Sequence, residues 1–309
     1  MAKPTFDPGL TQQYTGALRR AINKDGSFNV NRRGTNWHDI HPYLHLISMP
    51  WPRFLSLVFM AYLAANTIFA TLYYSLGPGH LLGGDAPQNF DRFLNAFFFS
   101  AHTLTTVGYG NVAPRTIPAN FIAATEALVG LLGFALATGI LFGRFSRPSA
   151  RIGFSDLALI APYEGRTSLQ FRIVNRRPNA LMEMEATVIL MWVEGEPGNL
   201  KRNFQALPLE RDTVDFLALT WTIVHPIDEA SPLFGKTKED LERKQAEVLI
   251  LIKGFDETFS QSVRSRFSYR FDEIAWNAKF TPAFDFDETG NMVLNINKVG
   301  NYALVEPAA

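Results

Sequence analysis

Long uncharged stretches occupy the first half of the chain, and short alternating stretches occupy the second half. Residues 54–80 carry no Lys, Arg, Asp or Glu. A helix from Phe54 to Leu76, at about 1.5 Å per residue, is long enough to cross the roughly 30 Å hydrocarbon core of a bilayer. Trp51 before it and Tyr73-Tyr74 at its end suit the two membrane interfaces. This pattern predicts a membrane span rather than a buried helix of a soluble protein.

Two further apolar runs follow a loop at 77–90 that contains Gly and Pro. The run from Phe93 to Thr105 is too short to cross a bilayer and predicts a re-entrant segment. The run from Ala119 to Gly143 predicts a second span, with Glu126 as its one acid. Small residues, which let membrane helices approach closely, recur along this second span: Ala123, Ala127, Gly130, Gly133, Ala137 and Gly139.

We expect regular secondary structure to be interrupted between these two runs. After residue 150 the pattern of apolar residues changes to a period of two. The predicted interruption is marked by Asn111, Pro114 and Pro118. Further on, apolar and polar residues alternate from Val263 to Phe271, which predicts a half-buried strand. Three more strands are expected at 169–173, 187–193 and 248–252, with turn-rich segments such as 194–198 between strands. Several short strands of this kind predict an antiparallel sandwich over 149–309.

The segment before the first span divides into two parts. Residues 1–36 are polar and mildly basic, and they lack the apolar core of a secretory signal. We expect a flexible cytoplasmic arm there. Residues 37–50 have apolar side chains at helical spacing, and Pro42 is tolerated in the first turn of a helix. This pattern predicts a short interfacial helix beside the pore domain expected at 51–148.

Composition and charge exclude several functions. Lys+Arg 29 balances Asp+Glu 29, so nothing suggests nucleic acid as a partner. The absence of cysteine excludes disulfides and thiolate chemistry. No metal-ligand spacing, nucleophile elbow or phosphate loop supports an enzyme, an organic substrate or a cofactor. Arginines precede the first span and follow the second, and few lie in the segment that connects the two spans. The positive-inside rule therefore puts both termini in the cytoplasm.

The segment between the re-entrant run and the second span matches a known ion-binding motif. Thr106-Val107-Gly108-Tyr109-Gly110 matches the potassium-filter motif. Backbone carbonyls of Thr106, Val107, Gly108 and Tyr109 would replace the hydration shell of K⁺, and the Thr106 hydroxyl would add an oxygen. Gly108 and Gly110 accept the strained backbone because they lack Cβ. One loop cannot enclose an ion, so a homotetramer is implied.

Motifs outside the filter carry a resemblance to a family. Trp221–Leu233, with the segment His225-Pro226-Ile227-Asp228, resembles the cytoplasmic signature of inward-rectifier potassium channels. Arg144–Pro148 and Asp272–Trp276 resemble further parts of the same family. The lack of cysteine is similar to its prokaryotic branch, which implies an integral, multi-pass protein of a bacterial inner (plasma) membrane. The family also implies an immunoglobulin-like cytoplasmic sandwich that regulates the pore, and an interfacial slide helix.

The same resemblance assigns three positions on the second span. Phe142 matches the hydrophobic constriction that gates by excluding water, and Gly139 matches the glycine at which the helix bends. Phe134 stands where strong rectifiers carry an acid, so we expect weak polyamine block. His225 and Asp228 are expected to be structural, because they lack the third group and the cleft that catalysis requires.

Two ionisable residues are expected behind the filter. Glu126 lies within a span, where a functional role is the default hypothesis and a structural hydrogen-bonding role is the alternative. His102 departs from the family, in which Glu is common at this place, and Asn111 stands where many animal members carry an Arg. A His close to Glu126 would make the filter sensitive to pH between about 5 and 8.

Anionic lipid is the expected regulator, because Arg53, Arg147 and Arg151 lie just outside the two spans. Two other functions would each explain part of the sequence. A two-helix potassium channel gated by a cytoplasmic ligand, without true rectification, is the main alternative; a nucleotide-binding regulator would need a dinucleotide fingerprint, and none follows residue 150. A membrane-anchored binding module would not explain the re-entrant run or the two filter glycines.

Overall fold

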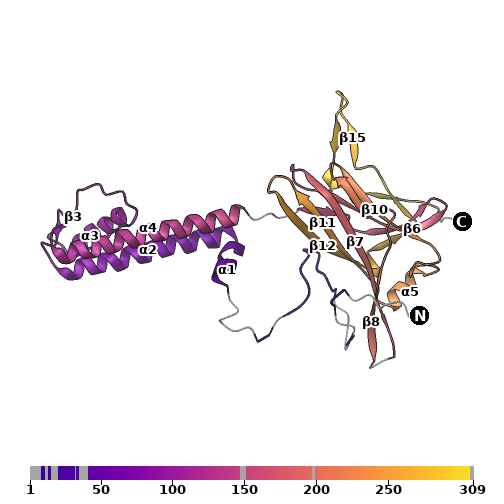
Figure 1. Cartoon of the computed structure of the whole chain (residues 1–309), viewed down its shortest axis with the longest axis horizontal. Coiled ribbons are helices and arrows are strands. Elements are labelled where there is room, and N and C mark those ends of the chain that lie inside the picture. Colours follow the sequence, from indigo (N-terminus) through magenta and orange to yellow (C-terminus); the bar gives the residue numbers. More distant parts are fainter. Residues whose placement is uncertain are drawn as a thin grey trace. The chain divides into compact units, whose positions relative to one another are not determined.

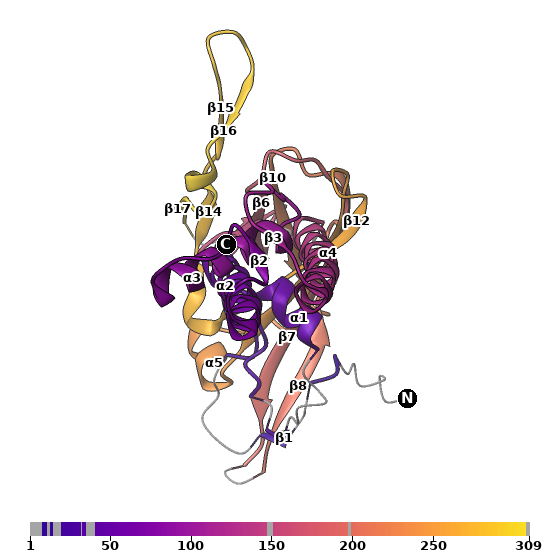
Figure 2. The ribbon, with the colours of Figure 1, turned by 90° about the vertical axis from the view of Figure 1, so that its left-hand side faces the viewer.

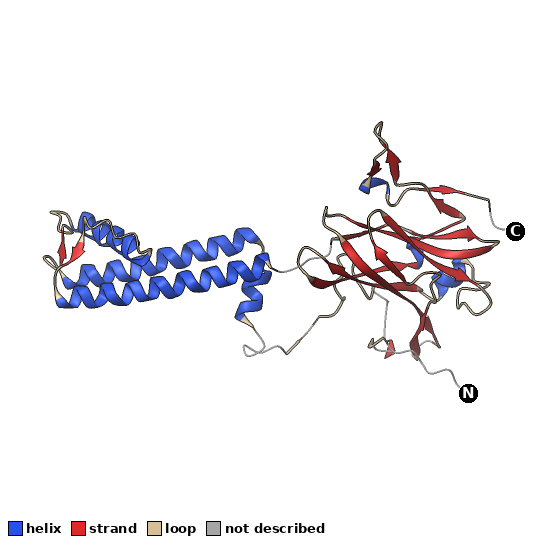
Figure 3. Cartoon of the chain, turned by 45° about the horizontal axis from the view of Figure 1, so that its top comes forward, coloured by secondary structure: helices blue, strands red, loops and turns tan. Residues whose placement is uncertain are grey.

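The structure is a computed structural model that describes residues 8–10, 13–14, 20–31, 33–34, 41–146, 151–196 and 199–306. It divides into two compact units, one formed by Arg32–Arg147 and the other by Met1–Asn31 together with Pro148–Ala309. The long helices belong to the first unit, and the extended strands belong to the second (Figure 3). The predicted combination of a helical membrane part and an all-β part is therefore confirmed.

Two long helices dominate the first unit. Both are long and apolar enough to cross a membrane, with a mean hydropathy of 1.8. Only 11% of the most apolar window in each is buried within the single chain, so lipid or other copies must cover the rest. The elements of this unit are α1 (Pro42–Ser48), α2 (Trp51–Leu76), β2 (Leu81–Leu82), α3 (Asn89–Leu104), β3 (Ala113–Pro114) and α4 (Ile117–Phe145).

Both spans begin before their predicted first residues. The helix α2 begins at Trp51 instead of Phe54, and α4 begins at Ile117 instead of Ala119. Each has a proline in its first turn, where the missing N–H has no helical partner to lose. Pro118 therefore starts a helix, whereas we had expected it to interrupt regular structure. The short re-entrant helix α3 is likewise longer than the predicted run.

The short helix α1 confirms the expected start at Pro42, while residues 37–40 lie outside the described part of the chain. The side chain of Arg144, near the end of α4, donates hydrogen bonds to the carbonyl oxygens of Leu46 and Met49, the latter at 2.8 Å. Its guanidinium also lies 4.5 Å from the ring centroid of Trp51. These contacts tie α1 to the end of the second span.

The second unit contains two sheets that share one hydrophobic core (Figure 1). One sheet has the order β1-β8-β7-β11-β12, with β9 beside β7. The other has the order β10-β6-β5-β13, with β4 beside β6. The predicted antiparallel sandwich is confirmed, although β13 pairs with β5 in parallel. Buried residues from both sheets form the core, among them Phe171, Ile173, Ile223, Met184, Val188, Ile250 and Ile252.

The strands of the sandwich include all four that the sequence predicts. Their bounds are β1 (Gln13–Tyr14), β4 (Ile152–Phe154), β5 (Ala158–Tyr163), β6 (Arg166–Asn175), β7 (Leu181–Glu194), β8 (Leu200–Ala206), β9 (Thr213–Phe216), β10 (Thr220–Ile227), β11 (Glu247–Asp256), β12 (Gln261–Arg270) and β13 (Ile274–Trp276). Between and after them lie α5 (Lys238–Arg243) and the short helices η2 (Phe271–Glu273) and η3 (Ile296–Lys298).

A C-terminal segment covers part of the five-stranded sheet. It comprises β14 (Ala278–Phe280), β15 (Phe284–Phe286), β16 (Met292–Leu294) and β17 (Tyr302–Leu304). Phe280 of β14 packs with Leu159 of β5, and the Arg172 guanidinium lies 4.6 Å from the Phe280 ring centroid. The hairpin formed by β15 and β16 extends away from the sandwich (Figure 2).

The described residues 20–31 pack on the outer face of the six-stranded sheet, which differs from the flexible arm we expected over 1–36. The Ala21 N–H donates to the buried Glu247 carboxylate at 3.1 and 3.0 Å, and the Ser268 hydroxyl donates to the Ile22 carbonyl at 2.8 Å. Ile22 itself is buried against Phe204 and other apolar side chains. Burial of Ile22 and hydrogen bonds between the backbone of this segment and side chains of the sheet therefore hold the segment in place, although its composition is polar.

Candidate functional site

The end of the re-entrant helix α3 holds the start of the Thr106–Gly110 loop. The Thr106 N–H donates to the Thr103 carbonyl at 3.0 Å. The His102 carbonyl accepts two hydrogen bonds, from the Val107 N–H at 2.9 Å and from the Gly108 N–H at 3.2 Å. The last carbonyls of a helix have no partner within the helix. Here they fix the position of the loop relative to α3.

The sign of the backbone angle φ alternates along this loop. Thr106 has φ 61°, Gly108 has φ 57° and Gly110 has φ 81°, while Val107 and Tyr109 are not among the described residues with positive φ. Alternation of this kind lets a short backbone turn successive carbonyl groups to one side. We therefore expect the carbonyl groups of this loop to turn to one side, as a row of oxygen ligands requires.

Thr106 carries strain that the sequence analysis did not assign to it. A positive φ is a genuine outlier for a β-branched residue, and such strain persists where the surroundings enforce it. We had assigned the backbone strain to Gly108 and Gly110 and an oxygen ligand to Thr106. No property of Thr106 as an amino acid predicts the left-handed backbone; only the motif as a whole could have indicated it.

An aromatic contact within the chain joins the last turn of α3 to this loop. The ring of His102 meets the ring of Tyr109 edge-on, with centroids 4.8 Å apart and an interplanar angle of 89°. We had expected His102 close to Glu126, but the hydrogen-bond partners of the Glu126 carboxyl are the hydroxyls of Tyr73 and Ser100. The structure therefore does not bring His102 and Glu126 together through a hydrogen bond, and it gives His102 a contact with the filter loop instead.

One side of the loop is open in the single chain. Val107 is 52% exposed and Tyr109 is 70% exposed. A Cβ atom added to Gly108 or Gly110 would meet no other atom within 4 Å. The surface that Val107 and Tyr109 present is apolar, and covering it requires another molecule or another copy of the chain.

The second span approaches α3 most closely at Gly130. A Cβ atom at this position would lie 2.1 Å from the carbonyl oxygen of Leu104, the last residue of α3. Only a glycine fits there. Of the small residues that the sequence analysis singled out on this span, Gly130 is thus required for the close helix contact that we predicted.

The three cavity and gate candidates lie on exposed parts of α4. Phe134 and Phe142 are each 73% exposed in the single chain, and a Cβ on Gly139 would meet nothing within 4 Å. These positions are therefore free to face a pore axis or neighbouring copies. Their proposed roles stay predictions.

Of the three arginines expected to contact lipid, two lie in the part of the chain that the structure describes. Arg53, in the first turn of α2, and Arg151, just before β4, are both exposed. Arg147 lies outside the described residues. The assignment to lipid stays a prediction for all three.

The His225–Asp228 motif is built into the sandwich. The His225 ring is buried, with Nδ1 2.6 Å from the Pro208 carbonyl oxygen and Nε2 2.8 Å from the Ser231 hydroxyl. Because a carbonyl only accepts, Nδ1 carries the proton and Nε2 accepts from Ser231. Burial lowers the pKa of His225 below its ordinary value, against the opposing effects of the Pro208 carbonyl and Asp228. The side chain therefore has a structural environment, as we expected.

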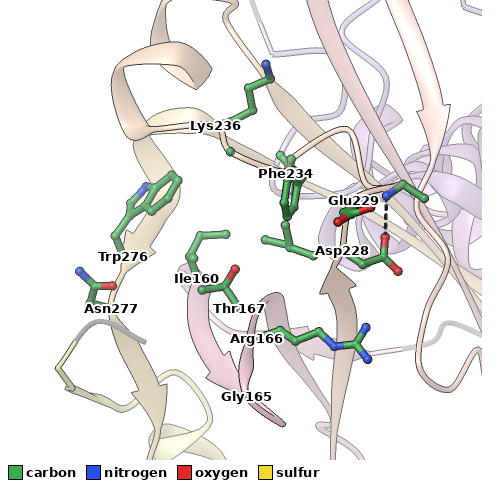
Figure 4. Close-up of a pocket in the computed structure, with 14 residues that line it drawn as sticks. Ile160, Gly165, Arg166, Thr167, Asp228, Glu229, Phe234, Lys236, Trp276 and Asn277 are labelled. Carbon is green, nitrogen blue, oxygen red and sulfur yellow. Dashed lines mark hydrogen bonds between the residues drawn. The ribbon is translucent and has the colours of Figure 1, made fainter. Parts of the chain in front are cut away.

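Two of the sequence motifs meet at an open pocket of about 860 Å³ in the sandwich. Asp228 and Phe234 line it from one side, and Trp276 of the second motif lines it from another (Figure 4). The Asp228 carboxylate accepts the Ala230 N–H at 3.0 Å, which fixes the turn after β10. The two motifs, far apart in sequence, therefore belong to one part of the fold.

Two membrane-length helices, a re-entrant helix between them and a strained loop after it define the class of a two-span ion channel with an all-β domain. The comparisons with known proteins agree. The family profile "Inward rectifier potassium channel C-terminal domain" matches residues 152–309, and the profile "Ion channel" matches residues 57–147.

Two individual relatives are named as inward-rectifier potassium channels. The chain is 36% identical over 283 residues to "Inward rectifier potassium channel Kirbac3.1" of Paramagnetospirillum magnetotacticum, covering 90% of this chain and 94% of that protein. It is 29% identical to "ATP-sensitive inward rectifier potassium channel 12" of Mus musculus, covering 92% and 71% of the two chains. The chain belongs to the inward-rectifier potassium channel family, whose members are ion channels and not enzymes.

Proposed function

We propose that four copies of this chain form a channel that conducts K⁺ passively and selectively across the membrane. The observation that carries the proposal is the alternating φ at Thr106, Gly108 and Gly110, directly after a re-entrant helix. A cation that leaves water needs oxygen ligands in place of its hydration shell, and a row of carbonyls supplies them. The carbonyls of Thr106 to Tyr109 and the Thr106 hydroxyl are the ligands, and K⁺ is the permeant ion. No other cofactor is part of the proposal.

The helix α3 contributes a second electrostatic effect. The C-terminal end of a helix carries a partial negative charge, and α3 ends at Leu104, directly before the loop. Four such ends directed at one axis stabilise a cation in the cavity below the filter. The chain itself thus supplies the filter ligands and the field that favours a cation over an anion.

A homotetramer follows from the exposed surfaces of the single chain. One loop offers oxygen ligands from one side only, and closed cyclic symmetry places four loops around an ion. Neighbouring copies then cover Val107 and Tyr109, which are 52% and 70% exposed in the single chain. The apolar faces of α2 and α4 divide between neighbours and lipid.

Regulation rests on the parts outside the filter. A ring of four Phe142 side chains gates by excluding water, and Gly139 allows α4 to bend. Arg53, Arg147 and Arg151 bind anionic headgroups. Both termini and the all-β unit lie in the cytoplasm of a bacterium, with the spans in its inner membrane. The sandwich thereby acts on the gate.

Ion flux into liposomes that contain the purified protein tests the proposal. We expect K⁺ uptake that barium blocks and that greatly exceeds Na⁺ uptake; equal uptake of the two ions overturns the assignment. Gly110→Ala should abolish the selectivity. Gly79→Ala is the matched control, because Gly79 has φ 80° against 81° for Gly110 and a Cβ on either meets nothing within 4 Å.

A further inference from the structure

A buried group of polar side chains joins both spans, α2 and α4, to the re-entrant helix α3. Asn66, Ser100 and Glu126 are each 0% exposed, and Tyr73 is 1% exposed. Asn66 and Tyr73 belong to α2, Ser100 to α3 and Glu126 to α4. From the sequence we had singled out Glu126 and had placed Tyr73 at a membrane interface, whereas the structure buries Tyr73 against the Glu126 carboxyl. The surrounding side chains are apolar, among them Ala70, Ala96 and Phe99.

The orientation of the Asn66 side chain determines which groups of this network donate and which accept. Its amide nitrogen donates to the Tyr62 carbonyl at 2.7 Å, which fixes the orientation of the amide. The amide oxygen then faces the Ser100 hydroxyl at 3.1 Å. An amide oxygen only accepts hydrogen bonds, and a serine hydroxyl has one hydrogen. One hydrogen cannot serve both this contact and the contact of Ser100 with Glu126, and both contacts are hydrogen bonds only if the Ser100 hydrogen points to Asn66.

The Glu126 carboxyl group contacts the same hydroxyl. Its Oε1 is hydrogen-bonded to the Ser100 oxygen, and its Oε2 accepts from the Tyr73 hydroxyl at 2.7 Å. Because the Ser100 hydrogen is already used, the proton between Ser100 and Glu126 must come from Glu126. A carboxylate has no proton to give, whereas a carboxylic acid has one. A charge here would also be costly, because Glu126 is 0% exposed and both hydrogen-bond partners of its carboxyl are neutral hydroxyls.

We propose that Glu126 is an uncharged carboxylic acid whose proton is donated to Ser100, so that a directed chain Glu126–Ser100–Asn66 holds the re-entrant helix to both spans. Ser100 lies two residues before His102, whose carbonyl holds the N–H groups of Val107 and Gly108. The chain of hydrogen bonds thereby sets the position of the filter loop. Ser100 and Glu126 are positioning residues, since neither touches the ion. The positioning role rests on the proposed function, whereas the protonation of Glu126 does not.

Infrared difference spectroscopy tests the protonation directly. The spectrum of wild-type protein in liposomes at neutral pH, minus that of Glu126→Gln, should show the carbonyl stretch of a protonated carboxyl group. The two bands of a carboxylate in its place overturn the proposal. If Glu126→Gln does not assemble, Tyr73→Phe serves instead: it removes a hydrogen bond from the acid carbonyl and should shift the same band, and an unshifted band overturns the proposal.

Selectivity measurements test the positioning role. Ser100→Ala should lower the K⁺/Na⁺ flux ratio about tenfold, the change expected for about one buried hydrogen bond, while the tetramer persists. Glu126→Gln should retain the ratio, because its amide donates to Ser100 and its carbonyl accepts from Tyr73. Glu126→Leu should lose it.

Thr125→Val is the matched control, since the Thr125 hydroxyl bonds only the Phe121 carbonyl of its own helix, at 2.9 Å. An unchanged ratio in Ser100→Ala, or equal losses in Glu126→Gln and Glu126→Leu, overturns the positioning role. A wild-type protein without K⁺ selectivity would contradict the proposed function, and the infrared band would still decide the protonation of Glu126.

Discussion

A Cβ atom at Gly130 would lie 2.1 Å from the carbonyl oxygen of Leu104. This contact brings the middle of the second span against the end of the re-entrant helix, from which the filter loop starts. The atom in the way belongs to the backbone, so no side-chain rotation can make room for a methyl group. The position of α4 and the position of the filter are therefore coupled at one glycine.

Gly130→Ala should push α4 away from α3 and destabilise the assembled protein by about 1–3 kcal/mol, the usual cost of overpacking. Gly133→Ala, on the same helix, is the control, because a Cβ there meets nothing within 4 Å. Thermal dissociation of the tetramer in detergent, followed by gel filtration, compares the two variants. Equal stability of both would show that the Gly130 contact does not constrain the helices.

The edge-on contact between His102 and Tyr109 predicts a selective effect on the filter. Such aromatic pairs contribute about 0.5–1.5 kcal/mol beyond their area burial. His102→Ala should therefore lower the K⁺/Na⁺ flux ratio several-fold, and His102→Phe, which keeps an aromatic ring at 102, should largely restore it. If Ala and Phe at this position gave the same ratio, the ring contact would not support the filter.

The sequence was sufficient for the two spans and the strands, but not for the contacts between distant residues. A charge-free stretch of membrane length has few alternative structures, and strict alternation along β12 has few as well. Nothing local indicates that Ala21 will bond Glu247, 226 residues away, or that Ser268 on the polar side of β12 will be buried under the N-terminal segment. Those contacts arise from tertiary packing, which periodicity does not record.

In the candidate site, too, the sequence predicted individual residues but not their partners from other helices. The filter motif predicted which residues carry the carbonyls, but the left-handed backbone of Thr106 depends on how α3 ends. Glu126 was recognisable as an acid within a span, yet its partners Tyr73 and Ser100 come from two other helices. His102 was expected beside Glu126 because of a family pattern, and its contact with Tyr109 instead depends on the turn of the loop.

The N-terminal segment should detach from the sandwich in acid. Burial raises the pKa of Glu273, but hydrogen bonds from Arg20, from the Arg270 N–H and from Lys24 outweigh it, so that the pKa is lowered overall. An acid with a lowered pKa stabilises the folded state above its unfolded pKa of about 4.3 and loses this contribution as pH falls through the folded value.

Glu273→Gln should therefore reduce the free energy of unfolding by about 2 kcal/mol at neutral pH, with a smaller difference from wild type in acid. Denaturant unfolding at several pH values measures this, with Glu288→Gln in the exposed hairpin turn as the control. A difference that did not depend on pH would contradict the ion-pair assignment.

The identity of residue 134 should decide how strongly polyamines block the pore. A cavity acid attracts spermine and Mg²⁺, and Phe134 offers no charge, so outward current through the wild-type protein should be blocked only weakly. Phe134→Asp should create block at micromolar spermine, because four carboxylates would then face one cavity in the tetramer. Leu136→Asp is the control: this residue is 69% exposed, close to the 73% of Phe134, but it points to a different side of α4. Recordings from planar bilayers distinguish the two, and micromolar block of the wild-type protein would contradict the assignment of Phe134 to the cavity.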